Sequence, residues 1–405
     1  MKLLTGQRTF WQSAMLATAT MVVCLAAQLV PVAKGTPGRA TVNLVRRTAT
    51  TRGLSAADRE AQTAGYYQEL LNRASDVTAR SATPAAGARD ADKPKMEELG
   101  ANQIVINESV RDFLIYKPLP NVDTHDPRFR NVHYVTNALG FVDENYAYDH
   151  PPSTRRLVVL GDSMARGLGV PPGTGWEPRL ERELNARFTS PAVQHFDVIN
   201  FGVSGYRITQ VTDIGLEVAP RFKPDVYVVV LSWLTVAKKW GLHLAQLVDE
   251  GIDPKYEFLR QVVRDAQLQK GDSTAMTEVK LRNFMVPTLR WSLRTLRERA
   301  ARDGASVVVF LVPHLKGIGS YDADFGPVRI MLQKEQIPYV DALDAFDELD
   351  PADYDVGDGL HPNPQGHEIL ERALMARIEG DPAVWAIIRG AATPAAPPAA
   401  ASGTR

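Results

Sequence analysis

Short apolar segments alternate with amphipathic stretches through the middle of the chain. The segments are rich in β-branched residues and comprise Leu157–Leu160, Val198–Asn200, Val226–Leu231, Ser306–Val312 and Tyr339–Asp341. Near-continuous apolar strands are typical of a parallel sheet that helices cover on both faces. The pattern therefore predicts five strands of one parallel sheet.

Helical periodicity is clear between the predicted strands. Between the first two strands, apolar residues recur four positions apart at Trp176, Leu180, Leu184 and Phe188. Before the fourth strand, a similar stripe is formed by Leu289, Leu293, Leu296 and Ala300. Such stripes are the buried faces of amphipathic helices, and Gly304 stands where the second helix is expected to end. Strands joined by helical crossovers predict a doubly wound α/β sandwich, whose ligand sites lie at the carboxyl ends of the strands.

The N-terminal residues predict a membrane-targeting segment. Residues 10–33 carry no charge and follow the basic residues Lys2 and Arg8. About 20 apolar residues suffice to span a bilayer as a helix. We expect residues 1–33 to be a retained membrane helix, with a cleaved signal segment as the alternative.

The charges around this segment give two opposite indications of its orientation. The basic residues that follow it before the first acidic residue, Asp58, are Lys34, Arg39, Arg46, Arg47 and Arg52. The positive-inside rule would keep the rest of the chain inside the cell, whereas a short basic lead usually directs export. We expect export, which predicts a membrane-anchored protein with an extracytoplasmic (periplasmic) domain, or a secreted form after cleavage.

Composition divides the remainder into a linker, one folded domain and a tail. Residues 34–95 are largely of low complexity, with room for a short helix, and 390–405 are rich in Ala and Pro and are expected to be disordered. Residues 96–389 form the folded domain. The chain has 46 Lys+Arg against 47 Asp+Glu, which argues against nucleic-acid binding. With Cys24 as the single cysteine, no metal-ligand spacing and no phosphate-binding loop, we expect neither a metal nor a cofactor.

Two motifs carry candidate chemistry. Gly161-Asp162-Ser163 follows the first predicted strand directly, and a serine on such a turn can be held above the sheet as a nucleophile. Taken alone the tripeptide is equally typical of a capped turn.

The second motif follows the last predicted strand. Asp358 and His361 are three positions apart, so one turn can place the carboxylate against one imidazole nitrogen and direct the other outward. Asn363 and Pro364 then predict a helix start, which would define where His361 emerges. The alternative is a His361 that only caps or packs against this helix.

Together the two motifs resemble the SGNH or GDSL family of serine hydrolases, over about residues 130 to 380. The resemblance implies a flavodoxin-like sheet, with Ser163 as nucleophile, His361 as base and Asp358 as acid. It also implies an oxyanion site formed by the backbone N–H groups of Ser163 and Gly205, with Gly202 the alternative glycine. The Asn-x-x-Gly-Phe sequence that begins at Asn137 is similar to a lead-in of envelope-associated members.

The chain departs from the family after the third strand. Where the family usually has Gly-x-Asn-Asp, with the Asn side chain donating to the oxyanion, this chain reads Ser232-Trp233-Leu234-Thr235. Leucine cannot donate a hydrogen bond, and loss of one oxyanion donor costs about 100-fold to 1000-fold in rate. The alternatives are a slow enzyme or a substitute donor, such as the hydroxyl of Ser232 or Thr235 or a side chain from the segment after them.

The resemblance implies a serine esterase that removes an O-acyl group from a cell-envelope glycan or lipid through an acyl-enzyme. An O-acyltransferase on the same substrates, and a non-catalytic module that binds or scaffolds envelope glycan, are the alternatives. Residues 236–285 are expected to form either a lid or substrate wall, or a surface helical pair. His314, at the end of the fourth strand, is a candidate substrate contact, whereas His367 is expected to be structural.

Overall fold

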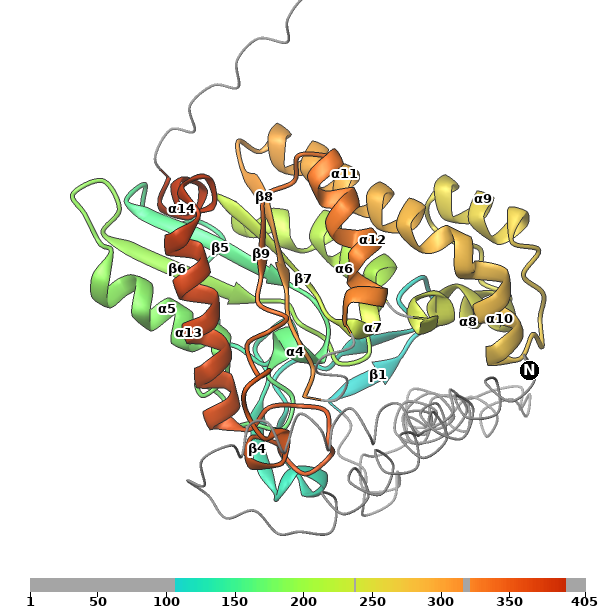
Figure 1. Ribbon diagram of the computed structural model, residues 1–405, viewed down its shortest axis with the longest axis horizontal. Coiled ribbons are helices and arrows are strands. Elements are labelled where there is room, and N and C mark those ends of the chain that lie inside the picture. Colours follow the sequence, from blue (N-terminus) through green and yellow to red (C-terminus); the bar gives the residue numbers. More distant parts are fainter. Residues whose placement is uncertain (1–105, 237, 316–320, 391–405) are drawn as a thin grey trace, which may run out of the picture. The chain divides into compact units, whose positions relative to one another are not determined.

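The computed structural model describes residues 106–236, 238–315 and 321–390 (Figure 1). The predicted membrane helix, the linker and residues 391–405 of the predicted tail lie outside these residues. In the part of the chain that is described, no helix combines the length and apolar character needed to cross a bilayer. All elements named below belong to one compact unit.

The centre of this unit is a parallel sheet. Its strands are β5 (Thr154–Leu160), β6 (His195–Asn200), β7 (Val226–Leu231), β8 (Ser306–Leu311) and β9 (Tyr339–Asp341). They lie in the order β6-β5-β7-β8-β9 and every neighbouring pair is parallel. The predicted α/β fold with a five-stranded parallel sheet is confirmed, and the order is the flavodoxin-like one. All five carboxyl ends therefore meet at one edge.

The first two strands begin three residues earlier than the apolar pattern predicts. Arg156 of β5 pairs in register with Asp197 of β6 and donates to its carboxylate at 2.7 and 3.0 Å. The same guanidinium also donates to the carbonyls of Ala147 and Phe222. A charged residue in a buried strand position is stable only with such partners. Because the partners are remote in sequence, the local pattern could not indicate them.

Helices cover both faces of the sheet (Figure 1). The helices on one face are α5 (Trp176–Arg187), α13 (Pro364–Gly380) and α14 (Pro382–Arg389), and those on the other are α6 (Ile208–Glu217), α11 (Met285–Arg302) and α12 (Tyr321–Lys334). Most of the predicted apolar stripes are fully buried, with Phe188 following the end of α5. Gly304 has a φ of +73° just after α11, which is the left-handed conformation of a helix end.

The segment between β7 and α11 is helical. Its elements are α7 (Trp233–Val236), η4 (Lys238–Gly241), α8 (Leu242–Glu250), α9 (Glu257–Asp265), α10 (Thr274–Leu281) and η5 (Arg282–Phe284). Leu244, Leu247 and Leu259 are fully buried and belong to the same core as α6 and α11. The helices of this segment therefore pack on the core, and its role as a lid or substrate wall stays a prediction.

Further short elements lie outside the sheet. They are the antiparallel pairs β1 (Asn107–Ser109) with β2 (Tyr116–Pro118) and β3 (Asp123–Asp126) with β4 (Val132–Val135), together with η2 (Pro127–Phe129), α4 (Ser163–Arg166), η3 (Ala219–Phe222) and η6 (Pro351–Asp353). The apolar pattern did not predict the two hairpins, because short strands that are largely exposed carry little periodicity.

Three carboxyl groups are clustered where β6 meets α5. Asp143 accepts a hydrogen bond from the backbone N–H of Asn200 at 2.7 Å, Glu177 accepts one from its side chain at 3.2 Å, and Glu181 accepts one from Val198 N–H at 2.6 Å. Burial is the largest cause that raises the pKa of each. Repulsion within the cluster also raises the pKa of Asp143 and Glu177, and Asp197 raises that of Glu181. Hydrogen bonds oppose this shift without cancelling it. The folded protein therefore retains protons here that the unfolded chain has released.

These carboxyls make stability depend on pH. A raised carboxyl pKa means that the folded state binds more protons than the unfolded state once the pH exceeds about 4, so the free energy of unfolding falls as the pH rises. Glu177→Gln removes one of the groups that bind these protons. The free energy of unfolding should then fall less steeply between pH 5 and 8, by up to about 1.4 kcal/mol per pH unit. Urea unfolding at several pH values measures this. Glu298→Gln, an exposed position on α11, is the control, and an unchanged slope in Glu177→Gln would contradict the assignment.

Candidate active site

The turn after β5 presents Ser163. Asp162 caps α4, because its Oδ1 accepts the N–H of Met164 at 2.9 Å, and its Oδ2 accepts the hydroxyl proton of Ser232. Burial raises the pKa of the Asp162 carboxyl, while these two hydrogen bonds act to lower it. A Cβ on Gly161 would lie 2.7 Å from the Ala165 side chain, so only glycine allows this tight turn. Ser163 is thereby held at the first position of α4.

The structure brings Ser163, His361 and Asp358 together. The Nε2 atom of His361 lies 2.8 Å from Ser163 Oγ, and its Nδ1 atom lies 2.6 Å from Asp358 Oδ2. Ser163 and His361 are 198 positions apart in the sequence, and both are buried. This is the nucleophile, base and orienting carboxylate arrangement of a serine hydrolase triad.

The second oxygen of Asp358 fixes the carboxylate. Asp358 Oδ1 accepts the backbone N–H groups of Leu360 and His361, both at 2.9 Å. Burial acts to raise the pKa of this carboxyl, but the hydrogen bonds and charge of His361 outweigh it and lower the pKa to about 2. Asp358 is therefore ionised across the physiological range. It can hold the imidazole in one tautomer and stabilise its protonated form.

Hydrogen bonds hold the loop that carries His361 on both sides of this residue. Asn363 caps α13 by accepting the N–H groups of Gln365 and Gly366, each at 3.0 Å, and Pro364 takes the first helical position. This is the helix start that the sequence predicts. The carbonyl of His361 also accepts the N–H of Val356 at 3.1 Å. His361 thus emerges from a rigid turn.

The two candidate oxyanion glycines face different constraints. A Cβ on Gly202 would lie 2.5 Å from the backbone nitrogen of Arg166, so this glycine is needed for the loop after β6 to approach α4. Asn200 reinforces that approach, since its side chain donates to the carbonyl of Ala165 and accepts from Gly202, both at 2.8 Å. Gly205 instead has a φ of +82°, and a Cβ there would lie 2.8 Å from the hydroxyl of Tyr116.

Tyr116 is a site residue that sequence reasoning missed. Its hydroxyl donates to the carbonyl of Ser204 at 2.9 Å, and its own carbonyl accepts from the Tyr206 hydroxyl at 2.8 Å. In a trans peptide the carbonyl and the following N–H point in opposite directions, and no cis peptide occurs in the described part of the chain. The N–H of Gly205 therefore points away from Tyr116. No signal marked Tyr116, because it lies before the region of family resemblance.

The two hydroxyl groups after the third strand, β7, donate their protons to groups other than the catalytic serine. Ser232 donates to Asp162, and Thr235 donates to the carbonyl of Ser232 at 2.7 Å. A hydroxyl has one proton, so in this arrangement neither group is directed at Ser163. The two expected substitute donors are thus engaged in holding the turn. The backbone of Leu234 belongs to α7, and its side chain lies outside the described residues.

The two other candidate histidines, His367 and His314, have different surroundings. His367 accepts the backbone N–H of Trp176 through Nδ1 at 3.3 Å, at the start of α5, in line with the expected structural role. His314 follows β8, is fully buried, and places its ring centroid 5.8 Å from that of His361. His314 therefore lies beside the triad.

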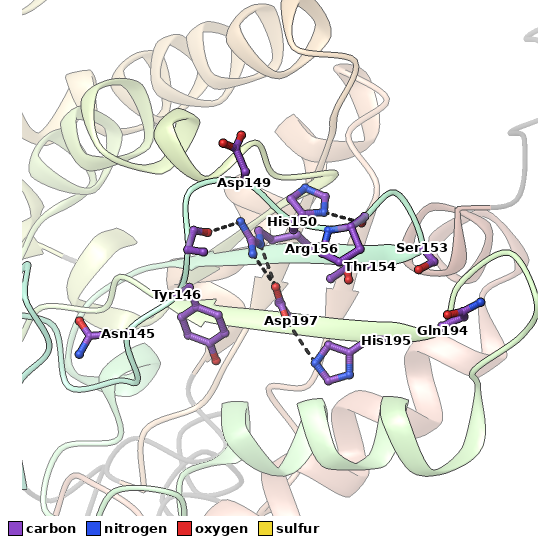
Figure 2. A pocket seen from close by; sticks show the side chains of 12 residues that line it. Asn145, Tyr146, Asp149, His150, Ser153, Thr154, Arg156, Gln194, His195 and Asp197 are labelled. Carbon is purple, nitrogen blue, oxygen red and sulfur yellow. Dashed lines mark hydrogen bonds and ion pairs between the residues drawn. The ribbon is translucent and has the colours of Figure 1, made fainter.

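A separate pocket of about 580 Å³ lies at the opposite edge of the sheet (Figure 2). Its lining includes Ser153, Thr154 and Arg156 near the start of β5 and His195 and Asp197 of β6. As Figure 2 shows, Asp197 lies between Arg156 and His195 and contacts both. Arg156, Asp197 and His195 are thus paired with one another, and the triad is at the other ends of these strands. Among the described residues, no group of three His, Cys, Asp or Glu side chains is placed to hold a metal ion.

Comparisons with known proteins give structural matches only. No family model and no curated protein matches the chain. The crystal structure of TesA matches with 16% identity and a TM-score of 0.37, covering 56% of this chain and 99% of that one. Axe2, an acetylxylan esterase from Geobacillus stearothermophilus, matches with 19% identity and a TM-score of 0.37, covering 55% and 94%. The psychrotrophic esterase EstA from Pseudoalteromonas sp. has 14% identity and a TM-score of 0.36, with 56% and 97% covered. Each of these matches extends over little more than half of this chain at less than 20% identity. The resemblance to the SGNH or GDSL family therefore stays a prediction from the motifs.

Proposed function

We propose that this protein is a serine ester hydrolase that acts through an acyl-enzyme. The observation that carries the proposal is the alignment of Ser163 Oγ, both ring nitrogens of His361 and the Asp358 carboxylate within hydrogen-bond distance. A capped turn or a packing histidine would not require this alignment. A non-catalytic module would have no use for a complete triad.

The triad accounts for each proton in the reaction. Ser163 Oγ attacks the ester carbonyl while His361 Nε2 takes its proton, and the ionised Asp358 stabilises the resulting imidazolium. His361 then protonates the leaving alcohol, which leaves an acyl group on Ser163. Water activated by His361 releases the acid and restores the enzyme. If an acceptor hydroxyl took the place of that water, the same site would transfer the acyl group, and product analysis with an added alcohol distinguishes the two reactions.

We further propose that the oxyanion is held by two backbone donors, the N–H groups of Ser163 and Gly205. Ser232 and Thr235 both donate their hydroxyl protons to protein acceptors, which supports an oxyanion site without a third donor from either hydroxyl. Turnover about 100-fold to 1000-fold below that of a site with three donors follows from this. Tyr116 acts as a positioning residue, because it holds the peptide that carries the Gly205 N–H.

The proposed substrate is an O-acyl group on a cell-envelope glycan or lipid. The uncharged segment of residues 10–33 supports an envelope location, with the catalytic domain on the extracytoplasmic side of a membrane.

The triad is tested by substitution. Ser163→Ala and His361→Ala should each lower hydrolysis of p-nitrophenyl acetate by at least about 1000-fold, because each removes a group that acts in the chemical step. A fluorophosphonate should label the wild type and Ser153→Ala, a control serine at the opposite edge of the sheet, but not Ser163→Ala. Equal ester turnover by the wild type and Ser163→Ala would eliminate this function.

The positioning role of Tyr116 predicts an effect on the transition state. Tyr116→Phe should lower kcat by about 10-fold to 100-fold with little change in KM, since misplaced donors chiefly affect the transition state. Its affinity for a boronic acid that mimics the tetrahedral intermediate should fall in parallel. Tyr206→Phe, which removes the other tyrosine hydroxyl of this contact, is the matched control and should have a smaller effect. Equal effects of the two variants would assign Tyr116 a purely structural role.

The location is tested with reporters. A reporter that is active only in the periplasm, fused after residue 95 in a Gram-negative host, should be active because the basic lead and apolar segment direct export. Activity of a cytoplasmic reporter alone at the same position would refute this location and move the substrate to the inner side.

A further inference from the structure

His314 is placed beside the catalytic base by the sheet itself. Strands β8 and β9 are parallel neighbours, with Leu311 opposite Asp341, so the segments that leave their carboxyl ends start at the same edge. His314 and His361 follow these two strands. Their ring centroids are 5.8 Å apart, with the ring planes inclined at 43°.

The ring of His314 has unmet hydrogen-bonding capacity. It is fully buried, and within the described part of the chain neither of its ring nitrogens has a hydrogen-bond partner. Its backbone is anchored, because its carbonyl accepts the hydroxyl proton of Tyr321. A buried polar group without a partner is costly, so such groups are uncommon in native proteins unless a ligand or water completes them.

His243 shows what a structural buried histidine looks like in the same protein. Its Nδ1 is 2.8 Å from the hydroxyl of Thr209, and its Nε2 is 2.6 Å from the carbonyl of Phe113. Both nitrogens of His243 are therefore satisfied by the fold. The described residues provide no equivalent partners for His314, although the two side chains are similarly buried.

The charge state of His314 suits binding rather than proton transfer. Burial, and secondarily the nearby His361, lower the pKa of His314 to about 3, while Asp358 acts in the opposite direction. His314 is therefore neutral at physiological pH, with one nitrogen that donates a hydrogen bond and one that accepts. It is too weak a base to compete with His361 for the proton of Ser163.

The reaction defines what comes close to this ring. The leaving oxygen of the ester must approach His361 Nε2 to be protonated, because Nδ1 is occupied by Asp358. The alcohol portion of the ester then lies next to His361, on the edge of the sheet where His314 lies. In a sugar or other polyol, a neighbouring hydroxyl group lies within about one hydrogen-bond length of the leaving oxygen and can both donate and accept.

We propose that His314 binds a hydroxyl group of the alcohol portion of the ester, and so selects acyl esters of polyols over esters of apolar alcohols. This inference rests on the proposed esterase function and specifies its substrate class. His314 takes no part in the transfer of protons or of the acyl group. A site that is built to bind a hydroxyl discriminates against an analogue without it, because the ring is then left unpaired.

Two acetate esters test the proposal. One is a mono-O-acetylated methyl glucoside with a free hydroxyl beside the ester, and the other is cyclohexyl acetate, which has a similar ring and no hydroxyl. The wild type should show the higher kcat/KM for the glucoside ester. His314→Phe and His314→Leu should each lower that value by about 10-fold to 100-fold, and should change kcat/KM for cyclohexyl acetate by less than about 3-fold. His314→Asn retains a donor and an acceptor and should recover part of the loss.

The outcomes distinguish failure of the His314 contact from failure of the esterase function. Equal losses on both esters would assign His314 a structural role, and no loss on the glucoside ester would show that it does not contact substrate; either result overturns this inference and leaves the esterase intact. Failure of the wild type to hydrolyse these esters or p-nitrophenyl acetate would overturn both. If neither apolar variant folds, as judged by thermal unfolding, His314→Asn decides the matter, because a change in its relative kcat/KM for the two esters supports the contact and an unchanged ratio overturns it.

Discussion

The buried carboxylate of Asp162 is the contact on which the catalytic edge depends. It joins the turn after β5 to the segment after β7, because one oxygen caps α4 and the other accepts the hydroxyl proton of Ser232. Burying a carboxylate is costly, and here two donors from different parts of the chain offset part of that cost. The position of Ser163 follows from this contact, since Ser163 is the first residue of the capped helix.

A second group of contacts holds α4 from the side of β6. Asn200 bonds to the carbonyl of Ala165 and to Gly202, and Asp143 in turn accepts the backbone N–H of Asn200. The Asn-x-x-Gly-Phe sequence thereby has a physical role. Asn137 Oδ1 accepts the N–H groups of Leu139 and Phe141, which shapes the turn that leads to Asp143. A motif some twenty residues before the nucleophile supports the nucleophile through the neighbouring strand.

The polar groups of the catalytic edge divide into those that the fold satisfies and those that it leaves for a substrate. Ser232, Thr235 and Tyr116 all direct their hydroxyl protons to protein acceptors, so they hold the site in shape. Ser163 and His361 are bonded to each other and are ready to exchange a proton. Among the described residues, neither ring nitrogen of His314 has a hydrogen-bond partner, and this is the observation from which we propose that it binds substrate.

The sequence by itself determined the features that depend on local pattern. Buried strands are apolar runs and helix faces are apolar stripes, so the sheet was predictable from local pattern. Asp358 could be paired with His361 because they are three positions apart, and the family resemblance added Ser163. Tertiary structure alone decided which remote polar groups meet. The pairing of Arg156 with Asp197, the reach of Tyr116 to Ser204 across 88 positions, and the engagement of Ser232 by Asp162 depend on strand order and register. Hydrophobic periodicity reports which side of an element is buried, but a hydrogen bond between distant residues leaves no periodic trace, because its geometry exists only after the chain has folded.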